Sequence, residues 1–486
     1  MLQLRSDRGI HGAVMPPRRS LLRASTGLGA ILLAGCSTIR PDARSGIALP
    51  AQLAAATGEP ANWPDPAWWR GFGSPELDAL MAQAVQANFD IRAAVARIRQ
   101  ADAQVRIAGQ ALLPTGNLTA SATRTQSPTQ TATAVTINNT GGRRFVQREL
   151  FQTGLQASYE IDFWGKNRAA VVAAEQNARA SRFDVAAITM TTEASVATTY
   201  FQILASREQL AIQQANLAAA EQTLSLLQQR LTAGTGTGLD IAQQQTLVGQ
   251  QRAAIPPLRQ SVEQNTYSLG TLTGQVPEQV PPPRMNLADI RVPSPRPGLP
   301  SEVLQRRPDV WQAEATLAAA QASVEQARTA MFPSITLTAN GGFQNVALEN
   351  LLRPGSVLYS LAAGLTQPIF QLGQLRAQYR LTQAQAEELL ENYRAAIVAA
   401  LVDVESAIVA LRETTEQEAL QGAATQAAER AYAISQTQLR VGTIDLLTLL
   451  VTQQAVFNAR NALAQARLQK LQAAVGLFRA LGGGWS

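Results

Sequence analysis

The chain has 486 residues, of which 46% are hydrophobic but only 5% aromatic, so close-packed alanine-rich helices are expected rather than a bulky core. The formal charge of +6 falls to about +2 without residues 1–35, which leaves no electrostatic argument for nucleic-acid binding. The only cysteine is Cys36 and the only histidine is His11. This inventory excludes an internal disulfide, a His/Cys metal cluster, and Ser/His or Cys/His catalysis. We therefore expect no enzyme, metal or bound cofactor.

Residues 1–35 are predicted to be a secretory signal peptide, because a basic segment precedes a short apolar run and a small-residue cleavage site. The run is shorter than the roughly 20 residues of a membrane-spanning helix. Its end, Leu-Ala-Gly-Cys, resembles a bacterial lipobox, which implies cleavage between Gly35 and Cys36 and a covalent lipid on Cys36. The alternative is a buried free thiol. Ser37, where an aspartate would favour inner-membrane retention, implies the outer membrane; Met15 is expected to be the true start, and the choice between Sec and Tat export is open.

The remainder of the chain is predicted to contain two copies of one structural repeat. The segment from Phe89 matches the segment from Pro308 at an offset of 219, and the match from Gly165 onward has an offset of 208. The first copy is therefore 11 residues longer, and the extra length reads as a surface loop after Pro114. The expected parts are a lipidated extended segment 36–74, repeat 1 over 75–280, a Pro-rich linker 281–300, repeat 2 over 301–482 and a tail 483–486.

Each repeat is predicted to contain one very long helix and a returning helix. These helices are expected over 166–232, 239–273, 373–441 and 445–481. At 1.5 Å per residue each long helix would extend about 100 Å, which is typical of coiled-coil packing. Pro256-Pro257 should kink the first returning helix, whereas the second repeat has Ala464-Gln465 there. A simple soluble coiled coil would explain these helices, but it would not explain the strands.

Four strands are predicted at about 117–125, 149–162, 334–344 and 357–367. Pro114 and Pro333 are the expected switch points from helix to strand. Apolar residues alternate with hydroxyl and amide residues, which fits either a transmembrane strand lining an aqueous lumen or a half-buried sheet in a soluble protein. The leader and the scarcity of aromatic residues favour the membrane. Four strands cannot close alone, and lipid excludes open sheet edges, so two copies would give eight strands and three copies twelve.

Several long motifs resemble the outer-membrane efflux factor family, the TolC and OprM group, and in particular its lipid-anchored NodT-like branch. They are WWRGFGSPELDALMAQAV from Trp68, YEIDFWGK from Tyr159, LPSEVLQRRPDVWQAEATLAAAQA from Leu299 followed by MFPSITLT, LTQPIFQLGQLRA from Leu365 and FRALGGGW from Phe478. The resemblance covers nearly the whole chain after the leader. It implies a mixed α+β homotrimer in the outer membrane of a Gram-negative bacterium. A 12-stranded barrel, four strands per chain, would continue into a periplasmic α-helical coiled-coil barrel.

The turns between the paired helices would lie at the periplasmic tip, where the family meets its adaptor and narrows its entrance. By resemblance, this assigns Arg230, Gly234, Thr235, Arg440, Gly442 and Thr443 to the tip. The two glycines also fit simple left-handed helix ends. Threefold symmetry would turn Asp240 or Asp445 into an acidic ring at the entrance, although both could instead cap the following helix. The two copies differ in the positions of these charged residues, so equal docking of an adaptor in both grooves is in doubt.

The function implied is a passive exit duct for small molecules such as drugs or solvents. It would work with a periplasmic adaptor and an RND-type inner-membrane transporter. A type I secretion channel is the alternative within this class. A structural lipoprotein that bridges the periplasm without conducting is an alternative from another class. A hydrolase is disfavoured by the absence of histidine after the leader. The exported compound and the cognate partners cannot be named from the sequence.

Overall fold

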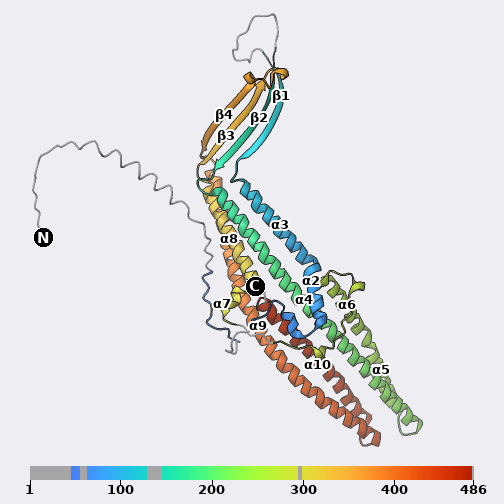
Figure 1. Cartoon of the computed structure of the whole chain (residues 1–486). Helices are drawn as coiled ribbons and strands as arrows, with labels where there is room; N and C mark the ends of the chain where they lie inside the picture. Colours follow the sequence, from blue (N-terminus) through green and yellow to red (C-terminus); the bar gives the residue numbers. More distant parts are fainter. Residues whose placement is uncertain (1–44, 55–62, 129–144, 294–297, 484–486) are drawn as a thin grey trace, which may run out of the picture. The chain divides into compact units, whose positions relative to one another are not determined.

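The computed structural model describes residues 45–54, 63–128, 145–293 and 298–483, which belong to one unit spanning Ala43–Ser486. The predicted signal peptide and the predicted lipidation and cleavage residues, Gly35 and Cys36, lie outside the described residues. Most of the predicted surface loop, residues 129–144, also lies outside them. The described residues contain long helices and one four-stranded sheet (Figure 1).

The first half of the chain runs helix, strand, strand, long helix, returning helices. Its elements are η1 (Trp68–Phe72), α2 (Pro75–Ala87), α3 (Phe89–Gln110), β1 (Thr115–Pro128), β2 (Phe145–Ile161), α4 (Lys166–Thr232), α5 (Gly238–Ala253) and α6 (Ile255–Thr273). Helix α2 begins where expected because the Ser74 hydroxyl accepts the Leu77 N–H at 3.2 Å and Pro75 occupies the first turn. Pro114 stands immediately before β1, so the switch from helix to strand falls at the proline.

The second half repeats this order after a short linker. The linker holds η3 (Pro277–Gln279) and η4 (Leu287–Asp289), and the elements that follow are α7 (Pro300–Gln305), α8 (Pro308–Thr329), β3 (Ser334–Asn345), η5 (Leu348–Asn350), η6 (Pro354–Ser356), β4 (Val357–Thr366), α9 (Leu372–Val441) and α10 (Leu446–Ala480). Pro333 stands immediately before β3, as Pro114 does before β1. Strands β1 and β2 are longer than expected, because their pairing continues to Pro128 opposite Phe145.

The returning helix expected over 239–273 is not continuous, which corrects that expectation. Helix α5 ends at Ala253 and α6 starts at Ile255, directly before Pro256-Pro257. Neither proline has a backbone N–H, so the helical hydrogen-bond ladder cannot pass through the pair. Helix α10 has Ala464-Gln465 at the corresponding place and runs unbroken.

The sheet is an antiparallel meander in the order β1-β2-β3-β4. Strands β1 and β2 form one hairpin, β3 and β4 form another, and β2 pairs with β3 to join the two halves of the chain. Figure 1 shows the four strands side by side beyond the ends of α3 and α8. Strands β1 and β4 are therefore the two edges of the sheet.

Helix α4 is the central packing element below the sheet. It contacts α3 and α6 of its own half and α8 and α10 of the other half, whereas α9 contacts α8 and α10. Much of this packing is through alanine; Ala169, Ala178 and Ala197 on α4 are at most 2% exposed. Small side chains let helix backbones approach closely, which explains the high alanine content and the low aromatic content of the chain.

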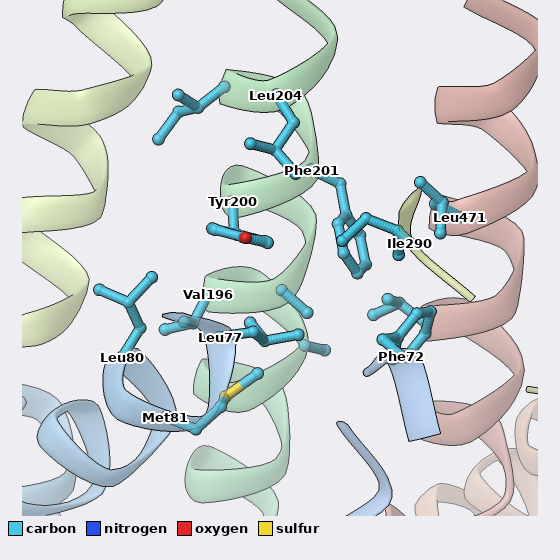
Figure 2. Close-up of a cluster of buried hydrophobic side chains, with 14 of the residues drawn as sticks. Phe72, Leu77, Leu80, Met81, Val196, Tyr200, Phe201, Leu204, Ile290 and Leu471 are labelled. Atoms are coloured by element: carbon cyan, nitrogen blue, oxygen red, sulfur yellow. The ribbon is translucent and has the colours of Figure 1, made fainter. Parts of the chain in front are cut away.

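A cluster of larger side chains forms where the N-terminal elements meet α4, α6 and α10 (Figure 2). Phe72 is fully buried, with its ring centroid 5.0 Å from that of Phe201, and Trp68 stacks on Phe478 at 5.0 Å. The Tyr200 hydroxyl bonds Ser74 at 2.9 Å. These aromatic residues attach the N-terminal segment to the long helices.

Glu193 lies on α4 beside this cluster and is only 8% exposed. Burial raises the pKa of its carboxyl to about 7, against an ordinary value of 4.5, and the nearby Trp68 indole opposes the rise. The unfolded chain therefore ionises this group before the folded protein does. The contribution of Glu193 to stability should therefore be greatest below pH 4.5, fall between pH 4.5 and 7, and stay constant above, with a total loss of up to about 3 kcal/mol.

Glu193→Gln should remove this dependence, because an amide stays neutral throughout that range. We expect the variant to melt at a higher temperature than the wild type at pH 8, and the two proteins to converge at pH 4.5. The measurement is thermal unfolding of the detergent-purified protein across this pH range. Parallel pH profiles for both proteins would contradict the assignment.

Candidate functional site

The sheet has one apolar face and one polar face, as the alternation predicts. Across the strands, Leu118 lies opposite Leu155, which lies opposite Gly341, which lies opposite Tyr359. On the polar face, the adjacent row across the four strands consists of Asn117, Gln156, Asn340 and Ser360. Within this row the Asn340 amide donates to the Ser360 hydroxyl at 3.2 Å. Matching rows follow along the strands, so the register places like side chains on like faces.

The apolar face is uncovered in the single chain. Leu118, Tyr359 and Leu361 are 81%, 82% and 80% exposed. An exposed apolar surface of this kind marks contact with lipid or with another protein. Among the described residues, no helix is both long enough and apolar enough to span a bilayer.

The outer edges of β1 and β4 carry backbone N–H and C=O groups with no strand partner within the described part of the chain. Unpaired backbone groups in a lipid environment cost several kcal/mol each. A sheet with an apolar face and two open edges is therefore incomplete as a membrane structure, and a further strand must cover each edge.

The first helix turn, between α4 and α5, is closed by its own backbone. Gly234 adopts φ +73°, and Thr235 donates its N–H and its hydroxyl to the Arg230 carbonyl at 2.9 and 3.1 Å. Thr237 then caps α5 in a reciprocal pair with Asp240, at 3.1 and 3.0 Å.

The second turn, between α9 and α10, has the same closure. Gly442 adopts φ +79°, and Thr443 donates its N–H and its hydroxyl to the Gln438 carbonyl at 3.0 and 3.1 Å. The capping residues are exchanged, however: Asp445 is now the cap and Thr448 lies three residues later. The two turns thus share one backbone design with the acid and the hydroxyl in swapped positions.

Both candidate ring acids are helix-capping residues. Asp445 is exposed, and the Thr448 hydroxyl and N–H donate to its Oδ1 at 2.6 and 2.9 Å. These bonds hold the pKa of the Asp445 carboxyl below its usual range, so it is fully ionised at neutral pH. Arg440 is exposed and Arg230 is half-buried. The structure places the predicted tip residues at two corresponding turns, with one candidate acid at each turn.

A pair of matching contacts between distant segments is not indicated by any of the sequence motifs. Asn88 donates its amide to the Leu272 carbonyl at 2.9 Å, and Arg307 donates to the Ala480 carbonyl at 3.4 Å. Arg307 is the counterpart of Asn88 at the offset of 219, and Ala480 is the counterpart of Leu272 at 208. The sequence offered one signal for these contacts. A glycine lies two residues after each carbonyl-bearing residue, and these two glycines, Gly274 and Gly482, align at the offset of 208.

Arg307 also forms a buried ionic contact. It is 6% exposed and bonds Asp309 at 2.6 Å and Asp403 at 3.1 Å. Burial alone would lower the pKa of its guanidinium, but the two carboxylates outweigh that effect and raise it. Among the described residues, no group of His, Cys, Asp and Glu side chains could hold a metal ion.

Taken together, these features define a mixed helix-and-sheet outer-membrane channel fold. The sequence profile described as outer membrane efflux protein matches residues 80–275 and 299–483. The pyoverdine export outer membrane protein OpmQ of Pseudomonas aeruginosa is 40% identical over 462 residues, 94% of this chain and 95% of OpmQ. The toluene efflux pump outer membrane protein TtgC of Pseudomonas putida is 30% identical over 474 residues, 96% of each chain.

Solved structures agree with these sequence matches. The outer-membrane channel OprN has a TM-score of 0.85 at 26% identity, over 92% of this chain and 99% of OprN. The outer membrane protein VceC of Vibrio cholerae has a TM-score of 0.81 at 25% identity, over 87% of this chain and 100% of VceC. The chain belongs to the outer membrane efflux protein family. It is an outer-membrane efflux channel protein, and its relatives are channels rather than enzymes.

Proposed function

We propose that three copies of this chain form the exit duct of a tripartite efflux system in the outer membrane of a Gram-negative bacterium. The observation that carries the proposal is the incomplete sheet: an exposed apolar face, a polar face, and two open edges. Three copies supply twelve strands and a lumen lined by hydroxyl and amide groups, whereas two copies give an eight-stranded barrel filled by side chains. The helices below the strands then form a coaxial periplasmic tube.

The partners in this proposal are a periplasmic adaptor and an RND-type inner-membrane transporter. The duct has no energy source of its own, so the transporter must supply it. The adaptor is assigned to the two helix turns around Gly234 and Gly442. The turns share one backbone closure, so both can receive the adaptor, but their different charges support docking of unequal strength. A lipid on Cys36 would anchor each chain, an assignment that rests on the lipobox resemblance.

The cargo is proposed to be a small molecule. The relative that is 40% identical is described by pyoverdine export and the relative that is 30% identical by toluene efflux. The higher identity favours a pyoverdine-like compound over toluene. A polar lumen suits either cargo as an unselective route, and selectivity is assigned to the transporter.

Deletion of the gene in its host tests this function. We expect pyoverdine to accumulate in the periplasm and to fall in the medium, with increased sensitivity to drugs or solvents if these are also exported. Complementation with the wild-type gene should reverse both effects. Unchanged export and sensitivity in the deletion strain, when the wild-type strain carries the protein in its outer membrane, would contradict the duct and favour the structural lipoprotein.

Two substitutions at Asp445 separate its capping role from a role in ion selectivity. Asp445→Asn keeps a good capping residue and removes the charge, whereas Asp445→Ala removes both and should destabilise α10 by about 1 kcal/mol. If three carboxylates ring the entrance, both variants should lower cation selectivity in planar bilayers to the same degree. Unchanged selectivity in Asp445→Asn would leave this residue as a helix cap only.

A further inference from the structure

An ion pair within the first half of the chain recurs at the corresponding positions of the second half. Arg252 pairs with Glu221 at 2.7 Å between α5 and α4. Arg460 pairs with Glu429 at 2.8 Å between α10 and α9. Each residue of the second pair lies 208 positions after its counterpart. Residues related by the sequence offset of 208 therefore also occupy equivalent positions in the two helix pairs.

The strand register follows the same rule. In the first hairpin Thr119 lies opposite Gly154, and in the second hairpin their counterparts Thr338 and Ala362 lie opposite each other. The offset of 219 carries β1 onto β3, and the offset of 208 carries β2 onto β4. All pairs of the β3–β4 hairpin follow from β1–β2 in this way. The correspondence therefore holds in both the sheet and the helices.

The ion pair between the two halves, in contrast, is not repeated at the corresponding positions among the described residues. Arg467 of α10 bonds Glu208 of α4 at 3.1 Å, and both side chains are less than one-third exposed. Their counterparts are Arg259 on α6 and Glu416 on α9. Both counterparts are exposed, and neither has an ion-pair partner among the described residues. Within one chain, this second pair is not formed.

The apolar residues of α9 give an independent indication of the same missing contact. Leu381, Val398, Val402 and Val409 are 38% to 56% exposed, whereas their counterparts on α4, Ala173, Met190, Ala194 and Phe201, are 0% to 8% exposed. Helix α4 contacts both α8 and α10 of the other half in addition to the helices of its own half. Helix α9 lacks the equivalent neighbours: the counterpart of α8 at the offset of 219 is an α3, and the counterparts of α10 at the offset of 208 are α5 and α6.

The missing α3 beside α9 must come from a second copy of the chain. Helix α3 itself exposes apolar side chains, with Phe89 at 64% and Ile107 at 62%. Charge also fits. Phe183 and Trp311 stack between α4 and α8 with ring centroids 5.9 Å apart, and their counterparts are Glu391 and Arg92. An aromatic contact between the halves thus corresponds to oppositely charged residues on the two uncovered surfaces.

We infer that the interface between copies repeats the interface between the halves of one chain. Glu416 of one copy pairs with Arg259 of the next, and α9 packs on the neighbouring α3. The register of β4 on the neighbouring β1 is also fixed: because Ser158 lies opposite Thr338, Thr366 lies opposite Thr119 of the next copy. This inference rests on the proposed trimer and assigns its contacts.

Cysteine pairs test the strand register in the full-length protein. Directly opposite residues of paired strands have Cβ atoms about 5 Å apart, close enough for a disulfide, while diagonal neighbours are about 7–8 Å apart. Thr366→Cys with Thr119→Cys should give heat-resistant, reducible dimers and trimers on mild oxidation of cells. Thr366→Cys with Ser121→Cys, on the same face but two residues out of register, should cross-link at least tenfold more slowly. Each single variant controls for Cys36.

Charge reversal tests the helix contact. Arg259→Glu and Glu416→Arg should each lower the temperature at which the trimer dissociates in detergent, and the double variant should restore it. Arg252→Glu is the matched control, because it disrupts an equally exposed pair within one half and should leave trimer dissociation unchanged. A double variant no more stable than the singles overturns the ion pair.

The outcomes separate this inference from the function on which it rests. A wild-type protein that is a monomer removes the proposed duct. A trimer that forms without the Thr366–Thr119 cross-link, or with a faster Thr366–Ser121 cross-link, retains the duct and overturns the assigned interface.

Discussion

Gly482→Ala is expected to destabilise the folded chain by about 3 kcal/mol or more. Gly482 follows α10 with φ +94°, a conformation that costs a residue with a side chain about 1–2 kcal/mol. A Cβ there would also overlap the Arg306 carbonyl oxygen, which is backbone and cannot rotate away. Gly274→Ala should behave in the same way, because its Cβ would lie 2.5 Å from the Ala87 carbonyl oxygen.

Gly422→Ala is the matched control for this prediction. Gly422 lies inside α9, and a Cβ added there would meet no atom within 4 Å, so alanine should be neutral or stabilise the helix by up to about 1 kcal/mol. Thermal unfolding of the detergent-purified proteins compares the three variants. Equal melting temperatures for Gly482→Ala and Gly422→Ala would show that the close approach to the Arg306 carbonyl does not require glycine at position 482.

Phe72→Ala is expected to cost about 3–5 kcal/mol, the range for removing a fully buried aromatic side chain. Its ring contacts Phe201 on α4 and Phe478 on α10, so the substitution leaves a cavity between the N-terminal segment and two long helices. The same change should release η1, and limited trypsin digestion should then cut after Arg70 much faster than in the wild type.

Phe72→Leu serves as the control, because it keeps most of the buried apolar surface and should cost only about 1–1.5 kcal/mol. Melting temperature and the rate of cleavage at Arg70 should change together across the two variants. If Phe72→Ala melts like the wild type and resists trypsin, the aromatic cluster does not attach the N-terminal segment.

Much of the fold followed from local patterns in the sequence. Pro114 and Pro333 marked the starts of strands because proline ends a helix, and the alternation of Leu118 with Thr119 gave the two faces of the sheet. A stretch without proline or glycine predicted α4, and a stretch interrupted only by Gly422 predicted α9. These signals act within a few residues, so they can be read without knowledge of the rest of the chain.

Other features depend on residues that are distant in the sequence. Asn88 and Arg307 bind carbonyls 184 and 173 positions away, and the buried carboxyl of Glu193 interacts with the side chain of Trp68, which is also distant in the sequence. Asp240 and Asp445 could be read either as ring acids or as caps, because an acid near a helix start fits both roles. The folded chain supplies the capping bonds, while a ring requires the neighbouring copies.

The number of chains in the detergent-purified complex tests the central claim most directly. Native mass measurement of the gently solubilised protein should give three chains, and boiling should reduce the complex to one. A single chain at all protein concentrations would contradict the account, because a lone four-stranded sheet cannot close within lipid.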